Sequence, residues 1–132
     1  MSTTIPTKTA ATPIASISNA AAANKRGTID LRGKVGAFIT MKITNGGTGP
    51  TAQCVCNILV SRATGTTPTA ASAGADWKTY WSFGGGSDNS AITEQTVWVE
   101  GVQHVEVEFI GNTAQAVTVE ALATVTDAYE ST

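Results

Sequence analysis

The sequence has little of what enzymes and metal proteins depend on. It holds a single histidine, His104, only two cysteines, and 14% charged residues among its 132, whereas charged residues make up about 25% of an ordinary soluble domain. Acid–base catalysis needs titratable groups that converge in one pocket, and zinc needs several protein ligands. No apolar run approaches the roughly 20 residues of a membrane span. We therefore expect no enzyme, no metal or cofactor, and no membrane segment.

The two cysteines, Cys54 and Cys56, are separated by one residue. In a strand both side chains point to the same face, and the single histidine leaves too few partners for zinc. We expect buried thiols, with a strained or intermolecular disulfide and a metal site as the weaker alternatives. The N-terminal stretch lacks the basic start and continuous apolar core of a secretory signal. Synthesis in a cytoplasm is therefore the expectation.

Charge is sorted along the chain. All eight Lys and Arg residues lie in residues 1–78 with two acids, and the other eight acids lie in residues 79–132 with no base. Such a chain can offer its basic region to the acidic region of another subunit, which steers association. Alternatively, strands from the two halves interleave and the charges mix. The net charge of −2 disfavours nucleic acid as a partner.

Residues 1–27 differ in composition from the rest. Ala, Thr and Ser fill 15 of these 27 positions, and there is no acid. Such a segment cannot build a core of its own, so it predicts an extended N-terminal arm. Asn19 could cap a short helix over residues 20–23. The arm carries three positive charges as candidate assembly contacts: Lys8, Lys25 and Arg26.

From residue 28 onward, apolar and polar residues alternate with the period of two that is typical of strands. The alternation recurs in several short stretches separated by glycine-rich turns such as NGGTGP, residues 45–50. This spacing predicts an all-β fold, an antiparallel β-sandwich or small jelly-roll-like barrel of roughly seven strands. The predicted organisation is an arm over residues 1–27 and a β-sandwich domain over residues 28–132.

Four polar residues are candidates for chemistry. His104 is out of phase with the apolar residues that follow it, so we expect it on the outer face, at the surface or in an interface. Glu106 and Glu108 share a face, and an exposed polar sheet face explains them better than an acid–base pair. Asp88 in GGGSDNS is expected in a flexible turn, with calcium binding as the alternative. No catalytic residue is predicted.

A cluster of aromatic residues follows the long polar loop at residues 63–76. In a regular strand its two tryptophans and its phenylalanine would share one face, with the tyrosine on the other. That face either completes the core or forms a contact patch for another subunit, since Trp and Tyr are enriched at interface centres. A sugar-stacking platform is a third interpretation. The aromatic candidates for an assembly interface are Trp77, Tyr80, Trp81 and Phe83.

Two stretches resemble small virion proteins of tailed bacteriophages. GVQHVEVEFIGNTAQAVTVEALA, residues 101–123, resembles their closing hairpin, and TIDLRGKVGAFITMKITNGGTGPT, residues 28–51, is similar to their opening strands. The resemblance implies a non-enzymatic virion structural protein made in the host cytoplasm. A capsid decoration (cement) protein on the capsid surface is favoured, with the major capsid protein or other virion proteins as partners and a homo-oligomer such as a trimer. The alternatives are a tail, neck or fibre-associated subunit and a carbohydrate-binding β-sandwich.

Overall fold

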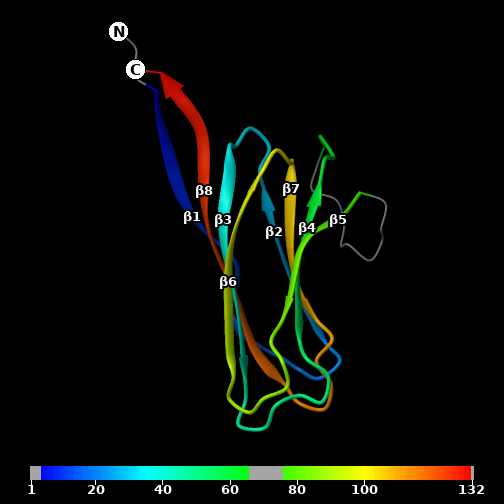
Figure 1. Ribbon diagram of the computed structural model, residues 1–132. Helices are drawn as coiled ribbons and strands as arrows, with labels where there is room; N and C mark the ends of the chain where they lie inside the picture. The colour runs from blue at the N-terminus through cyan, green and yellow to red at the C-terminus, as the bar shows by residue number, and fades with distance from the viewer. Residues whose placement is uncertain (1–3, 66–75, 132) are drawn as a thin grey trace.

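The computed structural model describes residues 4–65 and 76–131, with side chains for residues 7–65 and 76–127. Within these ranges the chain forms strands and no helix, arranged as two facing sheets (Figure 1). The predicted all-β sandwich is confirmed, with eight strands. They are β1 (Thr4–Asn19), β2 (Asn24–Asp30), β3 (Gly36–Asn45), β4 (Val55–Ser61), β5 (Lys78–Gly84), β6 (Ile92–Glu100), β7 (His104–Ile110) and β8 (Val117–Ser131).

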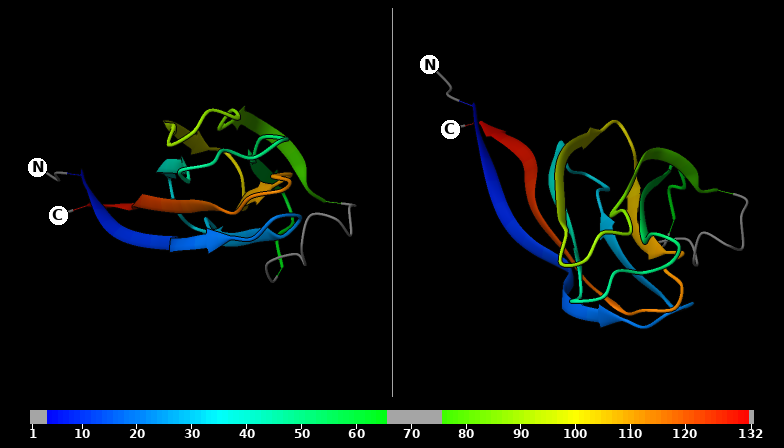
Figure 2. Two further views of the ribbon diagram at one scale, coloured as in Figure 1. Left: turned by 90° about the horizontal axis from the view of Figure 1, so that it is seen from below. Right: turned by 60° about the horizontal axis from the view of Figure 1, so that its bottom comes forward.

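The strands pair as a nested set. β1 pairs with β8, β2 with β7, β3 with β6 and β4 with β5, all antiparallel. One long hairpin folded over on itself produces this pattern, and two further pairings, β3 with β8 and β4 with β7, complete it. Sheet A has the order β1-β8-β3-β6 and sheet B the order β2-β7-β4-β5. This is the strand order of a jelly roll, and Figure 2 shows its two layers.

The core lies between the two sheets and is built by the alternation seen in the sequence. On β3, every second residue from Ala37 to Ile43 is fully buried, and on β7 the same holds from Val105 to Phe109. These residues belong to one apolar cluster that both sheets share. No helix among the described residues is long and apolar enough to cross a membrane.

The Thr/Ala-rich segment that was predicted as an arm supplies β1 and the start of β2. β1 pairs with β8 along its length, and its Ile14 side chain is buried in the core. The predicted short helix over residues 20–23 is wrong. A turn replaces it, closed by a hydrogen bond of 3.0 Å from Ala23 N–H to the Ala20 carbonyl, because so short a helix has too few internal hydrogen bonds to persist. The division into arm and domain stays a prediction.

Nested pairing also mixes the two charge classes. The basic strands β1, β2 and β3 are each paired with an acidic strand of the C-terminal half, β8, β7 and β6 respectively. Arg26 on β2 forms an ion pair with Glu108 on β7, and Lys34 lies 2.8 Å from Asp127 on β8. Lys42 stands in register between Glu94 and Glu120. The basic and acidic parts of the sequence therefore lie side by side within one folded chain, and their charges mix.

Candidate assembly surface

A bulge in β5 divides the predicted aromatic face. Trp81 is opposite Ile58 and Phe83 is opposite Cys56, but the register then shifts by one residue between Ile58 and Leu59. An extra residue in a strand moves the preceding side chains to the other face. Trp77 is accordingly buried at 7% exposure but lies outside the core cluster, whereas Phe83 packs against that cluster. The expectation that Trp77 shares a face with Trp81 and Phe83 is therefore wrong.

Tyr80 and Trp81 are exposed at the open side of the sandwich, where β5 and β6 are the edge strands of the two sheets. Their exposed fractions are 49% and 44%. The Tyr80 hydroxyl donates to the Trp98 carbonyl at 2.9 Å, and Trp81 Nε1–H donates to Gln95 Oε1 at 2.8 Å. Both polar groups are thus satisfied within the chain, and the ring surfaces are held in place facing solvent.

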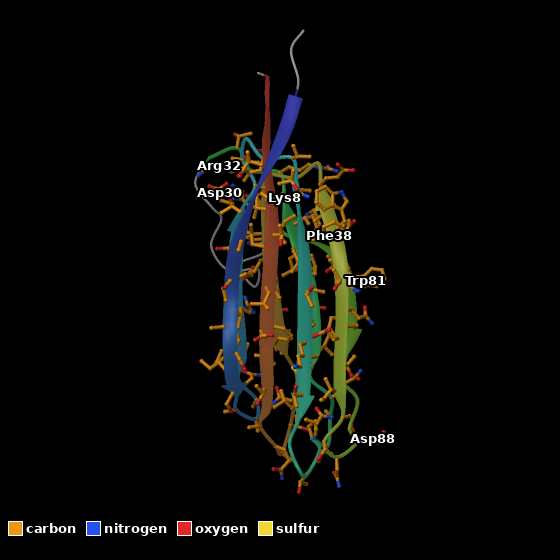
Figure 3. All side chains as sticks on the ribbon, turned by 90° about the vertical axis from the view of Figure 1, so that its left-hand side faces the viewer. Lys8, Asp30, Arg32, Phe38, Trp81 and Asp88 are labelled. Carbon is orange, nitrogen blue, oxygen red and sulfur yellow. The ribbon has the colours of Figure 1, made fainter. Side chains whose placement is uncertain are left out.

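Sequence reasoning missed the aromatic residues on the neighbouring sheet. Phe38 on β3 is 55% exposed and contacts the ring of Trp98 on β6, with ring centroids 5.0 Å apart. The alternation along β3 could have predicted this exposure, because Phe38 lies between the core residues Ala37 and Ile39 and so points away from the core. Figure 3 looks onto the outer face of sheet A and shows Phe38 and Trp81 in the same half of the molecule. We call Phe38, Tyr80, Trp81 and Trp98 the aromatic strip.

The predicted basic contacts are not gathered at the aromatic strip, although Lys8 lies in the same half of sheet A as Phe38 (Figure 3). Lys8 is exposed on β1, and Lys25 and Arg26 belong to β2. These strands form the edges of sheets A and B opposite to β6 and β5. Arg26 is also engaged with Glu108 inside the chain. The structure therefore does not gather the predicted interface residues into one patch.

The outward residues of β7, in the middle of sheet B, are buried, which corrects three expectations. His104, Glu106 and Glu108 are 0%, 1% and 7% exposed, although His104 was expected at the surface or in an interface and the two glutamates on an exposed sheet face. The carbonyl of Gly65, from the loop after β4, lies 3.3 Å from His104 Nε2, and Asp30 Oδ1 lies 3.7 Å from His104 Nδ1. Gly65 and Asp30 thus lie against His104, and Arg26 and Asn57 lie against Glu108, so these side chains point away from the core without being exposed.

A row of hydrogen-bonded polar groups crosses all four strands of sheet B. Ser82 donates to Asn57 at 2.7 Å, Asn57 donates to Glu108 at 2.9 Å, and Arg26 pairs with Glu108. Buried charges persist when they are paired and hydrogen-bonded in this way. Glu108 is therefore engaged in structure, and the described side chains include no group of three His, Cys, Asp or Glu residues placed to hold a metal ion.

Both cysteines are free and buried, which confirms the prediction of buried thiols. They belong to the core cluster. Burial raises the pKa of the Cys54 thiol to about 11, and it raises the pKa of Cys56 further still. A thiolate is the reactive form of cysteine, so both side chains are inert fillers of the core near neutral pH.

Two other places bring polar groups together. A hollow of about 380 Å³ beside the ends of β4 and β5 brings together Arg62, Asp76 and Lys78 with apolar neighbours. At the opposite end, Asp88 lies in the turn between β5 and β6, where its carbonyl accepts a hydrogen bond of 2.9 Å from Asn45 Nδ2. Neither place assembles a nucleophile with a base. The aromatic strip remains the surface best suited to contact a partner.

No protein-family model and no curated protein matches the sequence. Among solved structures, the fold is similar to YomS, an SPBc2 prophage-derived protein, at 18% identity over 95% of this chain and 97% of that chain, with a TM-score of 0.45. It is also similar to infectious bursal disease virus, Gx strain, at 9% identity over 92% of this chain and 32% of that chain, with a TM-score of 0.48. A third structure is the Yersinia pseudotuberculosis-derived mitogen, at 11% identity over 94% of this chain and 87% of that chain, with a TM-score of 0.39. These likenesses carry no conclusion about function.

Proposed function

We propose that this protein is a non-enzymatic structural subunit of a virus particle, and that it decorates and stabilises a phage capsid. The observation that carries the proposal is the aromatic strip. Three of its rings, those of Phe38, Tyr80 and Trp81, are exposed, while the polar groups of Tyr80 and Trp81 are already satisfied within the chain. Burying these rings against a protein partner would be favourable, because their polar groups need no water and because Trp and Tyr side chains contribute strongly to binding at protein interfaces.

Two further features support the proposal. The resemblance of residues 28–51 and 101–123 to small phage virion proteins concerns the strands that build the sandwich, with no active-site signature. The ionisable groups on the outer face of sheet B are paired and buried, which leaves them a structural role. The partner would be the major capsid protein or another virion protein. Binding to an assembled shell would stabilise the shell by mass action, and the subunit would act as a homo-oligomer such as a trimer.

Localisation on particles tests the proposal. Particles are purified from the source, labelled with an antibody against this chain, and the copies are counted against the main shell protein. Many copies over the head would support decoration. A few copies at one vertex or along the tail would move the function to a tail, neck or fibre-associated subunit. Absence from the particles would overturn the virion role.

Variants test whether the aromatic strip makes the contact. The double variant Phe38→Ser/Trp81→Ser should fold, because both side chains are about half exposed, and it should fail to bind particles that lack the wild-type protein. The matched control is Leu122→Ser, which changes an exposed apolar residue of sheet A, 43% exposed, outside the strip. If the double variant and the control bound particles equally well, the aromatic strip would not be part of the contact.

The exposed ring of Trp81 also favours a second candidate, a carbohydrate-binding module. Aromatic faces stack on sugars as well as on protein side chains, although Trp77, the other tryptophan considered for this role, is buried. Tryptophan fluorescence separates the two functions. A shift on addition of oligosaccharide, lost in Trp81→Ser, would favour sugar binding, and a shift only with purified particles would favour assembly.

A further inference from the structure

The four edge strands of the sandwich differ in how they are protected. Unprotected edges pair with other chains, and proteins usually block them with proline, bulges or a covering segment. β1 contains two prolines and three register shifts, and β5 carries a bulge. β2 is covered by β1, which packs so closely that a Cβ on Gly27 would clash with the Pro13 carbonyl oxygen. β6 has no proline, and its pairing with β3 runs without a register shift.

The backbone of β6 directs a row of groups away from the sheet. The Asn45 N–H donates to the Ala91 carbonyl at 2.8 Å, so residue 91 faces β3, while the Trp98 carbonyl faces outward to accept the Tyr80 hydroxyl. In an antiparallel strand the direction alternates with every residue. The N–H and carbonyl groups of Ile92, Glu94 and Thr96 therefore point outward, where no described residue pairs with them.

The side chains along this edge select the charge of its partner. Glu94 and Glu100 are exposed on β6, and the strand has no base of its own. Lys42 on β3 is in register with Glu94, but the two side chains form no ion pair among the described residues, so the Glu94 carboxylate is open to a cation on the other side. In the antiparallel pairing of two copies that would join all three open residues, Glu94 would stand opposite the same residue of the second copy. Like charges directly opposite each other destabilise a strand pair, and opposite charges stabilise it. The edge therefore disfavours a second copy of this chain and suits a cationic strand.

We propose that β6 is a strand-addition site for an extended protein segment carrying lysine or arginine on alternate residues. The incoming backbone would bond to Ile92, Glu94 and Thr96, its cationic side chains would lie beside Glu94, and its flanks would rest on the aromatic strip. Main-chain bonds supply affinity in this mode of recognition, and alternate side chains supply specificity. The inference rests on the proposed assembly role, because it names the chemistry of the segment that the subunit meets.

Titration of the isotope-labelled full chain with synthetic peptides tests the proposal directly. The probe is a short peptide of alternating lysine and threonine, and its control has glutamate at every lysine position. We expect the lysine peptide to shift the amide signals of β6 and to slow hydrogen exchange at Glu94 and Thr96. Glu94→Lys should weaken this binding by roughly fivefold to thirtyfold, from the sign change of a cross-strand charge pair. The matched control Glu120→Gln, on β8 of the same sheet, should bind like wild type.

A pair of variants separates the backbone contribution from the side-chain contribution. Thr96→Pro removes an outward N–H without breaking the pairing with β3 and should abolish peptide binding. Thr96→Ala loses the same hydroxyl but keeps the N–H, and should bind normally. If Thr96→Pro fails to fold by circular dichroism, Glu94→Lys still decides the matter.

Three outcomes would overturn strand addition. The first is equal binding of the glutamate peptide, or no effect of Glu94→Lys. The second is reversible self-association by analytical ultracentrifugation that Thr96→Pro abolishes, which would make a second copy the occupant. The third is normal attachment of Thr96→Pro and Glu94→Lys to particles while Phe38→Ser/Trp81→Ser detaches, which would leave the assembly role intact and remove only the added strand.

Discussion

The outer faces of the two sheets carry similar residue patterns but differ in how far their side chains are exposed to solvent. On sheet A, the outward residues of β3 and β6 include Phe38, Glu94 and Thr96, which are exposed. On sheet B, the outward residues of β7 are His104, Glu106 and Glu108, which are buried. The outward residues near the aromatic rings are exposed, and the outward ionisable residues of β7 are buried. An alternating pattern therefore predicts which side chains share a face. It does not predict whether that face is buried, because the residues that cover it are distant in the sequence.

The neighbours that bury the β7 residues come from β2 and from Gly65. Arg26 reaches Glu108 from β2, and the Gly65 carbonyl approaches His104. A matching cover is not found over the aromatic strip among the described residues. The difference points to a stable, self-contained sheet B face and to a sheet A face, with its β6 edge, that is available to a partner.

Replacing a glutamate by alanine on each face should give the largest difference in the free energy of unfolding. Glu108→Ala leaves Arg26 and Asn57 without their partner in a largely buried site and should lower the free energy of unfolding by about 2–4 kcal/mol. Glu94→Ala, on the open face, should change it by less than about 0.5 kcal/mol. Urea denaturation monitored by circular dichroism measures both. Equal losses would mean that the two faces are covered alike.

The shared core provides a reference that neither outer face influences. Cys56→Ser places a hydroxyl at a fully buried position in the apolar cluster and should cost about 1–3 kcal/mol in the free energy of unfolding. In the wild type both thiols should resist alkylation at neutral pH until urea unfolds the chain, because burial raises their pKa. Rapid labelling of the native protein would contradict the buried placement of the cysteines.

The rim of the covered face should respond to pH. Arg32 hydrogen-bonds to Asp30 and lowers the pKa of that carboxyl from 3.8 to about 2. Because the pKa is lower in the folded chain, the associated stability is present above pH 3.8 and is lost as the pH falls toward about 2. Arg32→Gln should return the Asp30 pKa toward 3.8 in a carboxyl NMR titration. The stability change should be small, because both side chains are well exposed. An unchanged pKa would assign the shift to another neighbour.

The smallest effect is expected on the open face itself. The hydroxyls of Thr40 and Thr96 are 2.9 Å apart across β3 and β6, and cross-strand threonine pairs of this kind contribute roughly 0.2–1 kcal/mol. Thr40→Val should therefore cost about 0.5 kcal/mol in the free energy of unfolding. Thr44→Val is the matched control, since the Thr44 hydroxyl has no hydrogen bond within the described residues. A loss as large as that of Glu108→Ala would mean that the outer face of sheet A is packed after all.

The sequence by itself determined the β architecture, the core residues of β3 and β7, and the burial of both cysteines. These follow from a period of two, which is a local property of the chain. It did not determine the role of residues 4–19 as a strand, the exposure of Phe38, or the burial of His104, Glu106 and Glu108, because each depends on a segment distant in sequence. The bulge in β5 separated Trp77 from Trp81 by a register shift against β4 that no local pattern encodes. The basic residues lie early in the sequence and the acidic residues lie late. Only the nested pairing of strands brings these charges together across neighbouring strands, because it places early strands beside late ones.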